Sequence, residues 1–231
     1  MKCLVITGAS AGIGLHTADL FAKSGYQVIN LSRRRCPLDQ VTHINCDLSE
    51  PGFIEAISPQ LTNTLQNAEE VVLIHNAAKL VNDSTLETPS NQFREVLEIN
   101  VVAPNTLNYF VIPYMQAGSS ILYVGSTLSE KAVPGSFSYV TSKHAMVGMM
   151  RATCQDLAGR RIHTACVCPG FTDTEMLRQH VPEDVMEQIS GMSAFERLVS
   201  PDEIADTLLW AAQSPVINGS IIHANLGQVE R

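Results

Sequence analysis

Two reactive side chains, Tyr139 and Lys143, lie four residues apart in the stretch YVTSKHAM, which is typical of the start of a helix. Residues at i and i+4 lie on one face of an α-helix, so the phenol and the ammonium could share a pocket. A neighbouring cation favours the ionised form of a phenol, which would make Tyr139 a proton donor or acceptor. Taken alone, the pair is also what an ordinary exposed helix surface contains.

A second chemical motif, TGASAGIG, follows the first predicted strand and contains Gly8, Gly12 and Gly14. Glycines at a strand-to-helix turn let the backbone approach a pyrophosphate, and the N-terminus of the next helix offers unpaired N–H groups. The spacing is G-x-x-x-G-x-G and differs from the commoner G-x-G-x-x-G fingerprint. We therefore expect a dinucleotide site here, with a glycine-rich packing turn as the alternative.

The second predicted strand ends in NLSRRR, where a nucleotide-binding fold reads the ribose of its cofactor. An acidic residue there would bond the ribose hydroxyls and repel a 2′-phosphate, whereas an arginine accommodates the phosphate. Ser32 stands at the position of the acid, and Arg33 and Arg34 follow it. The residues predict NADP(H) in preference to NAD(H), unless the arginines only face solvent.

The elements that must position these residues alternate between short β-branched runs and longer amphipathic segments. The predicted strands are 3–7, 27–31, 42–46, 71–75, 120–124, 163–168 and 220–224. The predicted helices are 12–24, 50–66, 91–117, 139–158, 173–192 with a break near Pro182, and 201–213. The pattern predicts an α/β protein with a three-layer, doubly wound, Rossmann-like fold, in which helices cover both faces of a roughly seven-stranded parallel sheet.

Prolines and capping residues indicate where the helices begin and end. Ser49-Glu50-Pro51 and Ser200-Pro201-Asp202 each place a capping side chain before a proline, which is typical of a helix start. Pro104 and Pro113 should kink or shorten the helix predicted over 91–117.

Size and charge limit the partners that the chain can have. It has 231 residues, 45% of them hydrophobic, and no linker or repeat, so we expect one domain over 1–231. The net charge is −8 and Arg33–Arg35 is the one run of cations, which argues against nucleic acid or a membrane as partner. The N-terminal apolar run is too short for a signal peptide, and we expect a cytoplasmic protein.

Metal-binding spacings are missing from the sequence. The six cysteines include no C-x-x-C, and we interpret them as small buried side chains in a reducing compartment. Cys166 and Cys168 alternate in an apolar run, so a strand would turn both to one face. His75, His144 and His163 have no second ligand at useful spacing, and we expect no metal site.

The motifs, taken in order, resemble the short-chain dehydrogenase/reductase family over nearly the whole chain, and in particular its compact single-domain members. The resemblance is carried by TGASAGIG, CDL, NAA, Asn100, Ser126, Tyr139 with Lys143, Pro169-Gly170 and Thr174. It implies a catalytic tetrad of Asn100, Ser126, Tyr139 and Lys143. With the arginine motif, it implies these cofactor-binding residues: Gly8, Ser10, Gly12, Ile13, Gly14, Ser32, Arg33, Asp47, Leu48, Asn76, Ala77, Tyr139, Lys143, Pro169, Gly170 and Thr174.

The resemblance also implies a role for each reactive residue. Tyr139 would exchange a proton with a carbonyl oxygen while hydride reaches the carbon, and Ser126 would hydrogen-bond that oxygen. Lys143 would bind the nicotinamide ribose, Asn100 would hold a water joined to Lys143, and Thr174 would fix the carboxamide. The implied activity is the NADP(H)-dependent interconversion of a small carbonyl compound and an alcohol. The resemblance also implies that the segment over about 171–198 forms a substrate lid.

Two departures from the family pattern have structural consequences. HNAA replaces N-N-A-G, so Ala78 would narrow the space near the cofactor. The C-terminal NGSIIHANLGQ lacks the usual G-G pair, which weakens an inference to the tetramer built through that end. Surplus apolar residues on helices 91–117 and 139–158 indicate a partner, and the resemblance implies a homodimer through this helix pair. A monomer with a thicker core is the alternative.

Two functions of other classes fit parts of the sequence. A dinucleotide-binding regulatory or interaction protein could keep the fold without turnover. A hydrolase could use Ser126 as nucleophile and Lys143 as base, but the glycine loop and Arg33 would then have no role.

Overall fold

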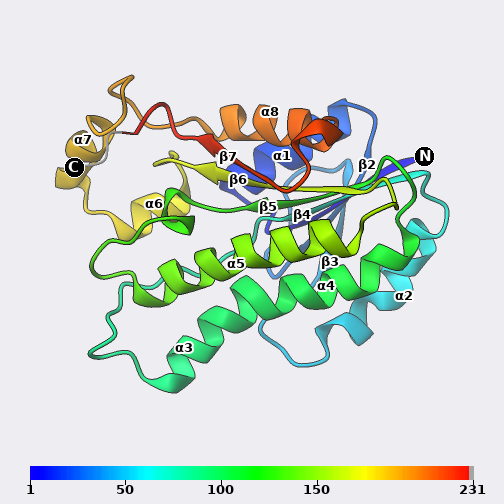
Figure 1. Cartoon of the computed structure of the whole chain (residues 1–231), viewed down its shortest axis with the longest axis horizontal. Helices are drawn as coiled ribbons and strands as arrows, with labels where there is room; N and C mark the ends of the chain where they lie inside the picture. Colours follow the sequence, from blue (N-terminus) through cyan, green and yellow to red (C-terminus); the bar gives the residue numbers. More distant parts are fainter. Residues whose placement is uncertain (229–231) are drawn as a thin grey trace.

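The computed structural model describes residues 1–228, and its centre is one parallel sheet (Figure 1). The strands are β1 (Lys2–Thr7), β2 (Gln27–Ser32), β3 (Val41–Asn45), β4 (Glu70–His75), β5 (Ser120–Val124), β6 (His163–Pro169) and β7 (Ser220–Ala224). Their order is β3-β2-β1-β4-β5-β6-β7, with every neighbouring pair parallel. The predicted doubly wound fold is confirmed, and each strand lies within one residue of its predicted bounds.

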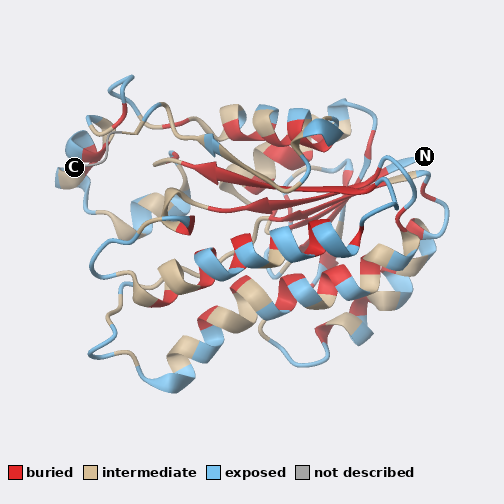
Figure 2. Ribbon diagram, in the orientation of Figure 1, coloured by how far each residue is buried: buried red, intermediate tan, exposed pale blue. Residues whose placement is uncertain are grey.

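Helices cover both faces of the sheet, and each face has its own apolar core. One face carries α1 (Gly12–Lys23) and α8 (Pro201–Ala212), and the other carries α2 (Phe53–Leu65), α4 (Ala103–Val111) and α5 (Phe137–Asp156). Figure 2 shows that buried residues make up most of the central strands and the sides of the helices that face them, whereas the edge strand β7 is partly exposed. Over residues 1–228, no helix is long and apolar enough to cross a membrane.

The strand order reverses between β1 and β4, because the chain leaves β1 towards β3 and returns to pair β4 with β1. In doubly wound sheets such a switch point opens a crevice at the carboxyl ends of the strands. The strands there are buried on both faces, since each consists of a nearly continuous apolar run. The loops that follow these strands can therefore present reactive groups to a ligand in the crevice.

The helix predicted over 91–117 is interrupted at both of its prolines. It begins as α3 (Ser90–Leu97), widens into a π-helical segment (Glu98–Val102), continues as α4 and ends in a 3₁₀ turn (Ile112–Tyr114). Pro104 has no N–H, so the carbonyl four residues earlier, that of Asn100, loses its usual α-helical donor. The predicted shortening is confirmed, since α4 ends at Val111, before Pro113. The π-helical segment contains Asn100, a predicted catalytic residue, and such segments are frequent at functional sites.

One helix start was predicted correctly and one was wrong. Ser200 caps α8, and its hydroxyl and the Glu203 carboxylate form the reciprocal hydrogen bonds of a capping box. By contrast, α2 begins at Phe53, after Gly52 at φ 79°, and Ser49 does not cap it. Ser49 instead donates its N–H and its hydroxyl to Asp47 Oδ1, at 3.0 and 2.7 Å. This local turn competes with the helix and delays its start.

The segment predicted as a lid contains three short elements, α6 (Glu175–His180), a 3₁₀ turn (Glu183–Val185) and α7 (Met186–Ser190). The predicted break near Pro182 is confirmed, since α6 ends before it. In Figure 1 this segment lies at the edge of the molecule, beyond the carboxyl ends of the strands. Its action as a lid stays a prediction.

Candidate active site

The glycine loop is fastened to the end of β4. Asn76 Nδ2 donates to the carbonyls of Thr7 and Gly8, at 2.9 and 3.1 Å, and the N–H groups of Asn76 and Ala77 both donate to the Thr7 hydroxyl at 3.0 Å. Gly8 has φ 74°, a conformation that glycine adopts without strain. The loop is thus held at the switch point of the sheet.

The first turn of α1 fits a pyrophosphate. Its N-cap residue is Ala11, no side chain caps it, and it contains no acidic residue, so its first N–H groups remain available to an anion. A Cβ at Gly14 would lie 2.4 Å from the Gly8 carbonyl oxygen and 2.5 Å from Asn76 Nδ2. Only glycine allows this close approach, so Gly14 keeps the loop packed tightly over the helix start.

The other residues of the predicted phosphate loop border the same opening. Gly12 has φ 51°, and a Cβ there would lie 3.1 Å from the methyl group of Thr174. Ser10 and Ile13 are partly exposed. The loop after β6 therefore approaches the start of α1, as a dinucleotide crevice requires.

Arg33 and Arg34, the first two of the three arginines after β2, have different surroundings. Arg33 is 75% exposed, and its guanidinium lies 3.7 Å from the Asp47 carboxylate, too far for a hydrogen bond. Arg34 is held by a carboxylate of α6, that of Glu175, at 2.8 Å. Ser32 donates its hydroxyl to the Arg34 carbonyl at 2.7 Å, which shapes the loop. Arg33 is therefore the arginine that is free to turn towards a phosphate.

Asp47 and Leu48, predicted near the adenine, follow β3 beside Arg33. The hydrogen bonds that Asp47 accepts from Ser49, and more weakly the charge of Arg33, hold the pKa of this carboxyl below its usual range. Asp47 is therefore ionised at neutral pH. Leu48 is buried and packs in the core on the α2 side of the sheet.

Lys143 and Tyr139 lie on one face of α5, at the carboxyl end of β5. The Lys143 ammonium is 5.4 Å from the centroid of the Tyr139 ring, within the range of a cation–π contact. Lys143 is 1% exposed, and its Nζ donates to the carbonyl of Val124 at 2.7 Å. The cation is thus buried and fixed, whereas Tyr139 is partly exposed.

Ser126 lies two residues beyond Val124 and caps the 3₁₀ turn Thr127–Ser129. Its hydroxyl oxygen accepts the N–H of Leu128 at 3.1 Å, and its own N–H donates to the Ser129 hydroxyl at 3.0 Å. The hydroxyl proton of Ser126 is thus left to donate to a ligand. α5 packs against this turn, and Lys143 bonds to the carbonyl of Val124, two residues before Ser126.

Gly125, before Ser126, has a steric reason to be glycine. A Cβ there would lie 2.7 Å from Cys166 Sγ and 2.8 Å from Cys168 Sγ. These sulfurs are 3.8 Å apart on one face of β6, as predicted, and all six cysteines are free and buried. The two thiols therefore pack against Gly125, directly before Ser126.

Asn100 is buried and has its side-chain amide fully bonded. Oδ1 accepts the Lys79 N–H at 2.7 Å, and Nδ2 donates to the Lys79 carbonyl at 3.0 Å and to the Ser142 hydroxyl at 2.9 Å. Ser142 precedes Lys143, so Asn100 fastens the loop after β4 to α5. A water assigned to Asn100 would therefore bond to its backbone carbonyl, which Pro104 deprives of its usual donor.

The residues after β6 are placed by close backbone packing. Pro169 ends the strand, and Gly170 donates its N–H to the Ala224 carbonyl at 3.1 Å. A Cβ at Gly170 would lie 2.9 Å from the Asn225 Cα. The Thr174 hydroxyl oxygen accepts an N–H of α6, that of Leu177, at 3.2 Å, which leaves its proton available to a ligand.

Asp83 is a site residue that the sequence analysis missed. Its carboxylate accepts the N–H and the hydroxyl of Ser138, next to Tyr139. Its backbone bonds to Gly135 and Phe137, at 3.0 and 3.3 Å. The start of α5, and with it Tyr139, is therefore clamped by a loop about 55 residues earlier in the chain. No local pattern around Asp83 signals this contact.

The geometry does not favour a serine hydrolase or a metal site. Among residues 1–228, no hydrogen bond joins Ser126 to Lys143, whose ammonium bonds to the Val124 carbonyl. Within the same range, no three metal-binding side chains form a cluster. Burial lowers the pKa of His75 to about 4, and its Nε2 bonds to Asn108 at 2.8 Å, so this imidazole is a neutral core group.

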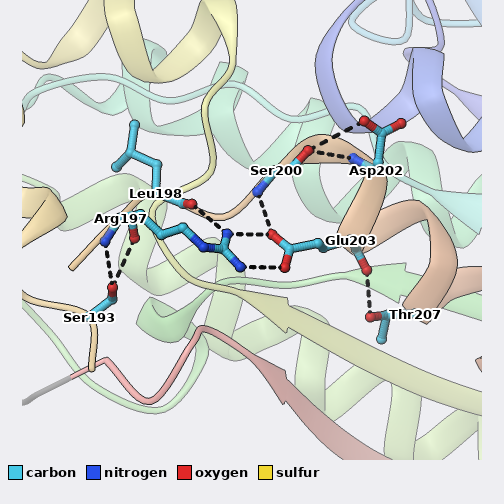
Figure 3. Close-up of polar contacts among 7 residues, drawn as sticks. All are labelled: Ser193, Arg197, Leu198, Ser200, Asp202, Glu203 and Thr207. Atoms are coloured by element: carbon cyan, nitrogen blue, oxygen red, sulfur yellow. Dashed lines mark hydrogen bonds and ion pairs between the residues drawn. The ribbon is translucent and has the colours of Figure 1, made fainter. Parts of the chain in front are cut away.

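The far end of the 171–198 segment is anchored to α8 (Figure 3). Arg197 donates from both terminal nitrogens to the Glu203 carboxylate, each at 2.7 Å, and Ser193 bonds to the Arg197 backbone. The Arg197 guanidinium and the Ser200 N–H hold the pKa of Glu203 at about 2. This end of the segment is fixed at neutral pH, because the carboxylate is ionised.

Known proteins match the chain over almost its full length. The family model described as enoyl-(acyl carrier protein) reductase matches residues 8–228. The 3-oxoacyl-[acyl-carrier-protein] reductase FabG of Thermotoga maritima is 29% identical over 99% of this chain and 98% of its own. Carbonyl reductase family member 4 of Xenopus tropicalis is 28% identical over 96% and 95%.

A solved structure agrees with these sequence matches. The ligand-free aldohexose dehydrogenase of Thermoplasma acidophilum has a TM-score of 0.90 and 25% identity, covering 98% of this chain and 93% of that one. The fold, the glycine loop and the matches lead to one assignment. This chain belongs to the short-chain dehydrogenase/reductase family of oxidoreductases.

Proposed function

We propose that this protein is an NADP(H)-dependent oxidoreductase that interconverts a small carbonyl compound and an alcohol, with Tyr139 as general acid and base. The observation that carries the proposal is the buried Lys143 ammonium, bonded to the Val124 carbonyl and 5.4 Å from the Tyr139 ring. It lies at the same edge of the sheet as the glycine loop. The two relatives named above are described as reductases, which supports the reductive direction.

The residues of the site divide the chemistry among them. The bound dinucleotide would supply the hydride. The Ser126 hydroxyl donates to the substrate oxygen and orients it, and Tyr139 gives that oxygen a proton as negative charge grows there. The Lys143 ammonium stabilises the phenolate that Tyr139 leaves behind. A water on the Asn100 carbonyl would return the proton.

Binding and turnover of the purified protein test the proposal directly. We expect NADPH to bind more tightly than NADH in a fluorescence titration, and the NADPH complex to reduce members of a panel of aldehydes, ketones and quinones. Tight binding without any turnover would favour a regulatory protein. Binding of neither cofactor would rule out the proposed activity.

We assign the preference for NADPH over NADH to Arg33, whose side chain lacks a hydrogen-bonded partner among the described residues. Arg33→Ala should weaken NADPH binding at least about tenfold and leave NADH binding nearly unchanged, because a hydrogen bond to a charged group contributes roughly 1.5–3 kcal/mol and only NADPH carries the phosphate. The dissociation constants of both cofactors check this. Equal losses for the two would move the phosphate contact to another residue.

We also propose a cytoplasmic homodimer formed through α4 and α5. Val102, next to α4, is 42% exposed, and Tyr109 on α4 is 84% exposed. Ala145, Gly148 and Ala152 leave an exposed face of α5 with small side chains, which allows close approach of a second copy. Sedimentation velocity should give twice the mass of the chain, and Tyr109→Glu should return it to a monomer. A monomeric wild-type protein would contradict this.

A further inference from the structure

One ion pair joins the two segments that border the proposed cofactor crevice. Arg34 lies two residues beyond β2, and Glu175 is the first residue of α6, 141 residues later. The guanidinium donates to both carboxylate oxygens, from Nη1 to Oε1 at 3.3 Å and from Nη2 to Oε2 at 2.8 Å. Gln179 donates to Oε1 at 3.2 Å and holds the carboxylate in place. The pair is therefore a two-pronged contact across the crevice.

Because of this contact, side chains of both charges surround the expected position of the 2′-phosphate. Arg33 and Arg34 supply two cations there, while Asp47 and Glu175 bring two carboxylates close to them. A phosphate monoester carries a charge of about −1.5 to −2 at neutral pH, so each carboxylate opposes it. Asp47 is bonded to Ser49 and lies after β3, beside Arg33. Glu175 comes from the segment predicted to act as a lid.

We propose that Glu175 is a specificity-determining residue, which lowers the preference for NADPH by competing with its 2′-phosphate for the Arg34 guanidinium. The inference rests on the proposed function. NADH has no phosphate and leaves the pair intact, whereas the phosphate of NADPH, held first by Arg33, gains a second cation when Arg34 exchanges the Glu175 carboxylate for it. Displacement is feasible, because both side chains are more than half exposed and such ion pairs contribute little by themselves.

The pair also connects cofactor identity with the lid segment. Glu175 follows Thr174, whose methyl group approaches Gly12 of the phosphate loop. The other end of the segment is fixed to α8 through Arg197 and Glu203. A phosphate that pairs with Arg34 therefore releases Glu175 and the start of α6. The other end of the 171–198 segment stays anchored to α8 through Arg197.

The test is a gain of binding, which a damaged protein does not produce. Glu175→Gln removes the charge and keeps the shape of the side chain. We expect its dissociation constant for NADPH to fall about three- to tenfold at low ionic strength, and that for NADH to stay within about twofold. The gain should shrink at high salt, where exposed charges are screened. It should vanish when Arg34→Ala is added, since the competition needs the guanidinium.

Glu183→Gln is the matched control, because Glu183 is another exposed carboxylate of the same segment, 3.9 Å from Arg178. Its NADPH affinity should equal that of the wild type. An unchanged NADPH affinity in Glu175→Gln, an equal gain for NADH, or a gain that persists without Arg34 would each overturn the inference. Failure of the wild type to bind either cofactor would overturn the proposed function as well, so the two failures are distinguishable.

Discussion

Tyr139→Phe should lower kcat for carbonyl reduction by about 10²- to 10⁴-fold, the contribution typical of a general acid. The substitution removes one hydroxyl and keeps the ring that faces the Lys143 ammonium at 5.4 Å. The NADPH dissociation constant should therefore stay within about twofold of the wild-type value. Steady-state kinetics with a saturating carbonyl substrate, together with a fluorescence titration of NADPH, measure the two quantities separately.

Tyr109→Phe is the control for this prediction, because it removes the same hydroxyl from a tyrosine that is 84% exposed on α4. Its kcat should match that of the wild type. Full activity in Tyr139→Phe would take Tyr139 out of the mechanism. A parallel loss of NADPH affinity would mean that the hydroxyl serves binding and not proton transfer.

Gly14→Ala should both destabilise the protein and weaken cofactor binding. The added Cβ would lie 2.4 Å from the Gly8 carbonyl oxygen and 2.5 Å from Asn76 Nδ2. Both groups belong to the hydrogen bonds that fasten the glycine loop to β4, so the loop must shift. We expect a loss of about 1–3 kcal/mol in the free energy of unfolding, as for other overpacked sites. NADPH affinity should fall at least tenfold, because the N–H groups of α1 move from their positions.

Gly191→Ala provides the comparison for Gly14→Ala. Gly191 follows α7 at φ −67°, and a Cβ there would meet its nearest atoms at 3.5 and 3.6 Å, which is ordinary contact. Urea unfolding should show little change in Gly191→Ala and a lower midpoint in Gly14→Ala. Equal midpoints and equal NADPH affinities would show that the loop tolerates a side chain at residue 14.

The local sequence was sufficient for the sheet and for most of the helices, because burial on both faces gives the central strands nearly continuous apolar runs. It was also sufficient for the start of α8, where Ser200 and Glu203 are close in the chain and cap each other. It was insufficient at α2, because the turn formed by Asp47 and Ser49 competes with the helix start that Pro51 suggested. Capping residues identify a helix start only when their side chains have no nearer partner.

The predicted site residues gather at one edge of the sheet, but several of their contacts could not be predicted. The four-residue spacing of Tyr139 and Lys143 predicted a shared helix face. It did not predict that the ammonium would be buried against the Val124 carbonyl. The water at Asn100 stays a prediction, but the sequence did not indicate that the Asn100 amide fastens Lys79 to Ser142. This role depends on two loops that meet only in the folded chain.

The sequence by itself determined the order of the strands and helices along the chain and the position of the glycine loop. It also determined the residue types proposed for proton and phosphate chemistry. These features are local, because apolar periodicity, capping and backbone freedom act over a few residues. The tertiary structure alone decided which distant groups meet: Asp83 with Ser138 before Tyr139, and Arg34 with Glu175 across the crevice. Such pairs depend on which strand ends become neighbours in the sheet, and that follows from packing of the whole chain.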